Sequence, residues 1–266
     1  MSNTAISMHT LGLVLAFLSA GAVAQDQPAP AEPDTREIPR NEFGHVSFAG
    51  TKENPGNWNG LLGSLANRQP NQRGNIPENI PYEEVPFQDW ARELHAARAQ
   101  DGGANDPHTR CKPSGGARMF HTPYGMEILD QGDTVFLLGV GSPHSWRQIF
   151  MDGRAHPENP DPGFLGHSVG RWEGDTLVVD TVGFLGDEHF WISRDGYPHT
   201  EQLHTIERFS RPDFDTLRYE ITIDDPGAYT QPWTGGWFLT FGEGNELFDY
   251  LCQENNLDPQ RMTGVE

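Results

Sequence analysis

The sequence predicts an all-β protein, built as an antiparallel β-barrel with one N-terminal helix. From about residue 117 onward, short segments of alternating or apolar residues are separated by turn residues such as Asp152-Gly153. The connections between these segments are mostly short, and short connections force neighbouring strands to be antiparallel. A meander with this many strands tends to close into a barrel, because closure removes the exposed strand edges.

Eight segments are expected to form the strands of this barrel. Thr176–Thr181 is typical of them, because β-branched residues dominate it and a Glu-Gly-Asp turn precedes it. The expected strands are 134–140, 146–151, 167–172, 176–181, 204–210, 217–224, 236–241 and 246–252.

One segment, over residues 84–99, has the spacing of a helix. Pro86 suits the first turn, and Phe87, Trp90 and Leu94 fall on one face at intervals of three or four residues. The sequence therefore predicts one helix, docked on the barrel through this apolar face.

The first 24 residues have the features of a secretory signal peptide. An apolar run extends from Leu11 to Leu18, and Ala22-Val23-Ala24 matches the small-x-small pattern before a cleavage site. The run is too short to span a bilayer, which needs about 20 apolar residues. We therefore expect cleavage after Ala24 and an exported protein, either periplasmic or secreted.

The rest of the chain is expected to form one domain behind a linker. Residues 25–50 begin with a segment rich in proline and charge, which predicts a flexible linker. Residues 51–82 are rich in Asn, Gly and Pro and are expected to be irregular. The predicted organisation is a signal peptide over 1–24, a linker over 25–50, and a single β-barrel domain with an N-terminal helical extension over 51–266.

The chain is strongly acidic, with 38 Asp and Glu against 18 Lys and Arg and a formal net charge of −20. Such a surface repels phosphate backbones and anionic lipids. The charge therefore argues against nucleic-acid partners and membrane insertion, and a small-molecule ligand or substrate is the expected partner. The sequence does not indicate an oligomeric state.

The two cysteines, Cys111 and Cys252, are expected to form a disulfide. Export makes oxidation the default for such a pair. Closing a loop of this length stabilises the fold by about 4–5 kcal/mol in the chain-entropy treatment. A catalytic thiol is the alternative, but neither cysteine lies in a recognisable nucleophile motif.

The segment GYPHTEQLHTIERF at residues 196–209 contains the candidate acid–base groups. On a strand with a period of two residues, His204 and Glu207 point to opposite faces. Asp180, on the preceding predicted strand, offers a carboxylate that can orient a histidine. We therefore predict His204 as the catalytic acid or base and Asp180 as its orienting carboxylate.

Further residues are expected to complete this site at the mouth of the barrel. His199 is placed in the loop before the strand as a second acid–base group, and Tyr229 is a candidate hydrogen-bond donor to developing oxyanion charge. Substrate contacts are expected from Trp172, Trp233 and His167. Because no nucleophile is evident, the predicted reaction is elimination, isomerisation or hydration of a small, partly apolar molecule, without a cofactor.

Two other functions fit the same residues. His199, His204 and Asp180 have the residue types of a divalent metal site, which would make the protein a metal-dependent hydrolase. Their H-x-E-x-x-H spacing differs from the zinc-binding helix motif H-E-x-x-H. The other function is non-catalytic binding of an apolar ligand, in which the histidines serve only as structural hydrogen-bonding groups.

Five segments together resemble an uncharacterised family of exported bacterial proteins, over roughly residues 84–254. The segments are RCKPSGGARMFHTPYGMEI, IFMDGRAHP, GHSVGRWEGDTLVVDTVGF, PHTEQLHTIERFSRPDFDTL and TIDDPGAYTQPW. The resemblance implies an exported β-rich domain, with a lipocalin-like fold by analogy, and it transfers no activity. This chain has Thr200 where the family typically has Ser, and residues 185–191 match the family poorly.

Overall fold

The computed structural model describes residues 36–60, 63–122, 124–140, 145–250 and 252, which belong to one compact unit. The predicted signal peptide over residues 1–24 lies outside these ranges. Within them, no helix is both long and apolar enough to cross a membrane.

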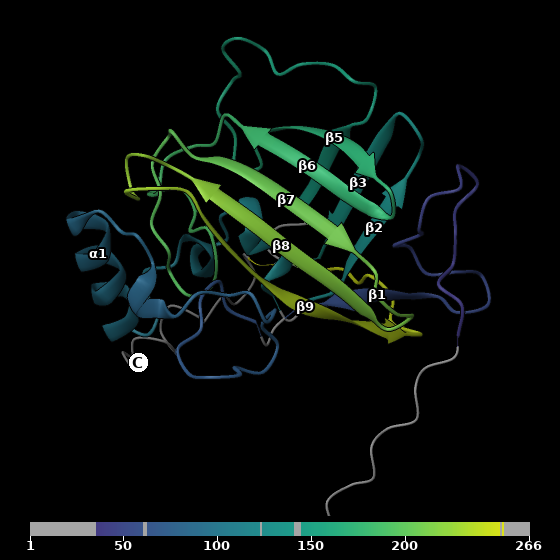
Figure 1. The fold of residues 1–266 in the computed structure, drawn as a ribbon, viewed down its shortest axis with the longest axis horizontal. Coiled ribbons are helices and arrows are strands. Elements are labelled where there is room, and N and C mark those ends of the chain that lie inside the picture. Colours follow the sequence, from purple (N-terminus) through teal and green to yellow (C-terminus); the bar gives the residue numbers. More distant parts are fainter. Residues whose placement is uncertain (1–35, 61–62, 123, 141–144, 251, 253–266) are drawn as a thin grey trace, which may run out of the picture. The chain divides into compact units, whose positions relative to one another are not determined.

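Nine strands form a closed barrel in which each strand pairs with the next along the chain and β9 pairs with β1 (Figure 1). This arrangement confirms the prediction of an all-β barrel with one helix, and the sequential strand order is that of up-and-down, lipocalin-like barrels. The strands are β1 Gly56–Asn59, β2 Met126–Asp130, β3 Thr134–Gly139, β4 Ser145–Phe150, β5 His167–Glu173, β6 Thr176–Val182, β7 His204–Ser210, β8 Thr216–Asp224 and β9 Trp233–Glu243.

The β4–β5 pair is parallel and departs from the antiparallel order that the sequence predicts. Its pairing is short, with Ile149 opposite Ser168 and Phe150 opposite Val169. A parallel pair requires the chain to return to the end of the barrel at which the first strand began. Residues 151–166 therefore form a long loop outside the barrel wall, seen above β5 and β6 in Figure 1.

The predicted helix is confirmed as α1, Asp89–Gln100, and short 3-10 helices lie at Tyr82–Glu84, Pro107–Arg110 and Gly116–Phe120. α1 begins later than the spacing predicts, because Phe87 pairs with Tyr229 in an isolated β-bridge and Gln88 keeps an extended backbone. The buried face of α1 includes His95, whose Nδ1 lies 2.9 Å from the Tyr82 hydroxyl.

Side chains fill the interior of the barrel. On β7 and β8, buried residues alternate with partly exposed ones, as a wall with an apolar inner face requires. Large aromatic rings occupy the inside, among them Trp58, Phe120, Phe209, Tyr219 and Trp237, each at most 2% exposed. A ligand inside the barrel would have to displace this close-packed core.

An ion pair lies inside the barrel between Arg147 of β4 and Glu207 of β7, with side chains 1% and 0% exposed. The Glu207 carboxylate also accepts a hydrogen bond from the Tyr219 hydroxyl at 2.9 Å. Arg147 donates to Ser168 Oγ at 2.9 Å and to Thr181 Oγ1 at 2.6 Å. This network joins strands β4 through β8, and its charges are paired and hydrogen-bonded, as burial requires.

Residues 36–50, part of the predicted flexible linker, pack against one end of the barrel. Val46 and Phe48 are each 3% exposed and belong to the hydrophobic core. The Arg40 guanidinium donates to Asp175, in the β5–β6 turn, at 2.8 Å. The linker prediction is therefore wrong for residues 36–50, because the apolar residues near their end are buried. Residues 25–35 lie outside the described part of the chain.

The predicted disulfide is confirmed, with 5.6 Å between the Cα atoms of Cys111 and Cys252. The predicted strand over residues 246–252 does not form in its described part, residues 246–250 and 252. The barrel is completed by β1 and β2. β1 lies in the segment predicted to be irregular, and its four residues are too few to give a period-two signal.

Candidate functional site

Asp180 of β6 and His204 of β7 form a hydrogen-bonded pair on the outer wall of the barrel, 2.8 Å apart between Oδ1 and Nε2. Val179 and Glu207 are buried on these strands, so the alternating residues Asp180 and His204 face outward. The two side chains are 29% and 33% exposed. The pair that the sequence predicts is thus present, but on the outside of the wall and not in a barrel mouth.

His156, from the long loop between β4 and β5, joins this pair. Its Nε2 atom lies 3.0 Å from Asp180 Oδ1, and its Nδ1 atom lies 2.8 Å from His167 Nδ1. Four side chains are therefore connected in the order His204, Asp180, His156 and His167, which we call the His–Asp chain. Sequence reasoning missed His156 because the parallel β4–β5 pairing, which brings its loop over the wall, has no local signature.

When His156 and His167 are both neutral, the hydrogen-bond pattern assigns the donor and acceptor at each ring. A carboxylate only accepts, so His204 and His156 both donate their Nε2 protons to Asp180. A neutral His156 then has an unprotonated Nδ1, which accepts the Nδ1 proton of His167. The remaining ring nitrogen, His167 Nε2, then has a lone pair, and it makes no hydrogen bond to a described residue. Partial burial lowers the pKa of His167, and positive charge on a protonated His156 and on Arg154 lowers it further, so the neutral form of His167 is favoured.

A cleft of about 420 Å³ adjoins the His–Asp chain between β4 and β5. His167 and the outward-facing side chains of β4 line it, together with residues 157–161 of the long loop. Phe150 stacks against His167 with ring centroids 5.3 Å apart, and the Arg154 guanidinium lies 3.9 Å from the Phe150 centroid. Trp146, at the edge of the cleft, is 60% exposed. The cleft thus presents an imidazole beside aromatic surfaces.

His199 and Tyr229 have structural contacts. His199 is 1% exposed, with Nε2 2.9 Å from the Phe190 carbonyl oxygen and its ring centroid 4.3 Å from that of Phe190. The Tyr229 hydroxyl donates to the Pro198 carbonyl oxygen at 2.8 Å, and burial raises its pKa. Within the described ranges, no hydrogen bond or ion pair connects either residue to the Asp180 carboxylate. Both side chains instead anchor the loop that leads into β7.

The three predicted substrate contacts lie in different surroundings. His167 lines the β4–β5 cleft. Trp172 stacks on His45, with centroids 4.4 Å apart, beside the segment that closes one barrel end. Trp233 is 5% exposed and packs against Tyr229, with centroids 5.5 Å apart. Of the three, His167 is the one placed to meet a ligand in this cleft.

A metal site does not assemble from the predicted ligands. In the part of the chain that the structure describes, no group of three or more His, Cys, Asp or Glu residues is arranged to hold a metal ion. A catalytic zinc site needs three protein ligands. The set of His199, His204 and Asp180 therefore gives no structural support to the metal-dependent alternative.

No protein-family model, curated protein or solved structure matches this chain. The resemblance to a family of exported bacterial proteins stays a prediction.

Proposed function

We propose that the protein is an exported enzyme that uses the His–Asp chain for acid–base chemistry on a small, partly apolar molecule bound in the β4–β5 cleft. The observation that carries this proposal is the 2.8 Å contact between the Nδ1 atoms of His156 and His167. With His156 tied to Asp180, this contact leaves His167 Nε2 as a free base in the cleft wall. The reaction class is elimination, isomerisation or hydration.

The proposed base is His167, which takes a proton from the substrate at Nε2. The imidazolium that results still donates its Nδ1 proton to His156, and His156 donates to Asp180, so the carboxylate stabilises the positive charge through the intervening ring. The proton then returns to the substrate at a different atom, or leaves with a departing group, which completes an isomerisation or an elimination.

His204 has a supporting role in this proposal. It donates to the same Asp180 oxygen as His156 does, at 2.8 Å, and it is 33% exposed. A second donor fixes the carboxylate, so that Oδ1 stays directed at both rings. This differs from the sequence prediction, in which His204 is the acid or base itself.

The cleft suits an uncharged, partly apolar substrate. Phe150, Leu165 and the exposed Trp146 provide apolar and aromatic surface, and Gln148 and Asp161 provide hydrogen-bonding groups. The Arg147 guanidinium beneath the cleft is already paired with Glu207. Export of the enzyme is supported by the Cys111–Cys252 disulfide, since disulfides persist in oxidising compartments.

Non-catalytic ligand binding is the second candidate, and the exposed Trp146 ring favours it. A ligand would then occupy the outer cleft, because aromatic rings fill the barrel interior. Binding of this kind requires the aromatic surface of the cleft but no base. The two functions therefore make opposite predictions for a variant that alters only His167.

The test is hydrogen exchange into a panel of small carbonyl and hydroxy compounds incubated with the protein in deuterated water. Proton abstraction exchanges a carbon-bound hydrogen for deuterium, which mass spectrometry detects without knowledge of the product. We expect exchange with the wild-type protein and its loss in His167→Gln. The matched control is His189→Gln, since the His189 side chain is 38% exposed and does not line the cleft.

Exchange that persists in a folded His167→Gln variant would remove His167 as the base. Binding of panel compounds without exchange by the wild-type protein would favour the non-catalytic function.

A further inference from the structure

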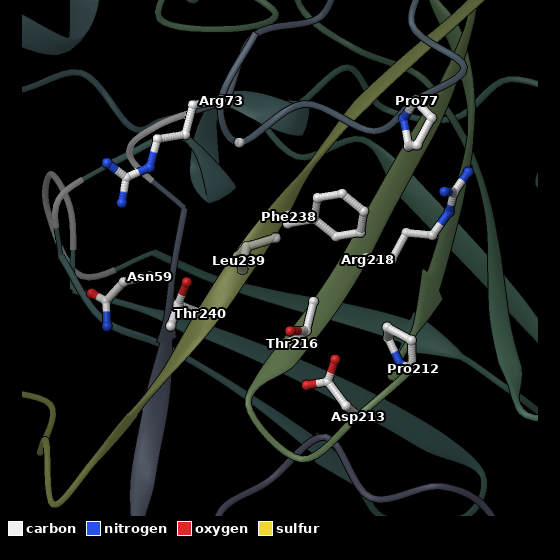
Figure 2. Close-up of a pocket in the computed structure, with 11 residues that line it drawn as sticks. Asn59, Arg73, Pro77, Pro212, Asp213, Thr216, Arg218, Phe238, Leu239 and Thr240 are labelled. Atoms are coloured by element: carbon white, nitrogen blue, oxygen red, sulfur yellow. The ribbon is translucent and has the colours of Figure 1, made fainter. Parts of the chain in front are cut away.

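A second hollow lies on the outer wall of β8 and β9, with a volume of about 680 Å³ (Figure 2). Its floor is formed by outward-facing side chains of the two strands, including Thr216, Phe238 and Thr240. Pro212 and Asp213, in the β7–β8 turn, border it on one side, and residues 73–77 border it on another. This hollow does not share residues with the His–Asp chain or the β4–β5 cleft.

Backbone hydrogen bonds hold the rim segment against the floor. The Phe238 amide donates to the Gly74 carbonyl oxygen at 2.7 Å, and the Ile76 amide donates to the Gly236 carbonyl oxygen at 3.3 Å. Ile76 is also 1% exposed, which anchors the segment in the core. Arg73 therefore stands on a fixed backbone at the edge of the hollow.

The hollow has guanidinium groups with unused hydrogen-bond donors. Arg218 binds Glu78 and Glu220 at 2.9 Å, both through Nη2, so its Nε and Nη1 atoms make no hydrogen bond to a described residue. The Arg73 guanidinium makes no hydrogen bond, ion pair or ring contact with any residue in the described ranges. Figure 2 places the two arginines on either side of Phe238.

These donors remain unused in a chain with 38 acidic and 18 basic residues. A guanidinium binds a carboxylate through two parallel hydrogen bonds, and such charge-assisted pairs are among the stronger polar contacts. A dianion is disfavoured, because Glu78, Glu220 and Asp213 lie at or beside the hollow. A monoanion gains the guanidinium contacts with less repulsion.

The floor and rim of the hollow supply apolar surface for the rest of the ligand. Phe238, Pro77 and Pro212 present apolar surface beside the two arginines. We infer that this hollow binds a small organic monocarboxylate, with its carboxylate on the Arg73 guanidinium and its ring or apolar chain over Phe238, on whose other side Arg218 lies. The Asp213 carboxylate and the Thr216 and Thr240 hydroxyls remain for a polar substituent on the ligand. The site is separate from the proposed acid–base centre and does not depend on it.

The test compares three probes of the same shape by isothermal titration calorimetry: 2-naphthoate, neutral 2-naphthylmethanol and dianionic 2-naphthyl phosphate. We expect naphthoate to bind at one site, at least about tenfold more tightly than either other probe, which corresponds to about 1.4 kcal/mol. Amide shifts at Phe238 and Thr240 in nuclear magnetic resonance spectra should locate the naphthoate in the hollow.

Arg73→Gln should weaken naphthoate binding by about five- to tenfold, as expected for loss of a charge-assisted pair. This variant should fold normally, because the Arg73 side chain is exposed and makes no hydrogen bond, ion pair or ring contact with a described residue. Arg171→Gln is the matched control: it removes the same charge from another exposed position, 58% exposed on β5, and should leave binding unchanged.

No binding of naphthoate at millimolar concentration overturns the proposal. Equal affinity for naphthoate and naphthylmethanol, or an equal loss in both arginine variants, overturns it as well. Tighter binding of 2-naphthyl phosphate than of 2-naphthoate contradicts the proposed preference of the hollow for monoanions.

Discussion

His156 and His167 are joined through their Nδ1 atoms, which lie 2.8 Å apart. A hydrogen bond between two ring nitrogens holds one proton, so one ring donates and the other accepts. Asp180, 3.0 Å from His156 Nε2, sets the direction, because a carboxylate can only accept. The contact is lost when both rings are protonated. When both are neutral, it leaves His167 Nε2 unprotonated.

Replacement of Asp180 with Asn is expected to lower turnover by about 10²–10⁴-fold. An amide offers a donor as well as an acceptor, so it no longer fixes the tautomer of His156 or stabilises the imidazolium. The measurement is the deuterium-exchange rate on a substrate found in the panel. Asp224→Asn is the control, since Asp224 lies 4.0 Å from His204 Nδ1 and contacts no other member of the chain. An equal loss of exchange rate in Asp180→Asn and Asp224→Asn would indicate a general effect of removing a negative charge, and would contradict the role of Asp180.

Glu207→Gln is expected to destabilise the barrel by about 3–5 kcal/mol, because it leaves the Arg147 charge buried without a carboxylate. Urea unfolding followed by tryptophan fluorescence measures the change. Glu173→Gln makes the same substitution in an exposed pair with Arg208 and should cost at most about 1 kcal/mol. A loss as small for Glu207→Gln as for Glu173→Gln would contradict the role assigned to the buried network.

Stability is expected to fall with acid through His95. Burial, followed by the charge of Arg68, lowers the pKa of this histidine to about 4 in the folded protein, against about 6.5 in an unfolded chain. The unfolded state therefore binds more protons between these values. The contribution of His95 is complete above about pH 6.5 and is lost as the pH falls toward 4, by at most about 3 kcal/mol.

The measurement for His95 is urea unfolding at pH 7.5, 5.5 and 4.5. The His95→Gln variant should lose less stability over this range than the wild-type protein. His189→Gln, at an exposed position, should follow the wild-type curve. Parallel curves for wild type and His95→Gln would mean that His95 does not titrate differently on folding.

Strand periodicity explains why the barrel and the His204–Asp180 pair could be predicted. Side chains at alternate positions share a face, and strands that follow one another along a chain most often pair. The Asp180–His204 pair could therefore be predicted, although residues 183–203 separate β6 from β7. β1 could not be predicted in this way, because its four residues, in a segment rich in Asn and Gly, are too few to show alternation.

The rest of the site depends on contacts that are distant in the sequence. His156 joins Asp180 only because β4 and β5 are parallel and their loop passes over the outer wall. His199 lies five residues before His204, but its ring turns into the core and binds the Phe190 carbonyl oxygen. Spacing along the chain does not distinguish a buried ring from one that faces a cleft.

The most direct test of the account is the protonation state of the His167 ring, read from its ¹⁵N chemical shifts at neutral pH. The account predicts a protonated Nδ1 and an unprotonated Nε2, and in Asp180→Asn a mixture of the two tautomers. A protonated Nε2 in the wild-type protein would contradict it, because His167 could not then accept a proton from a substrate in the cleft.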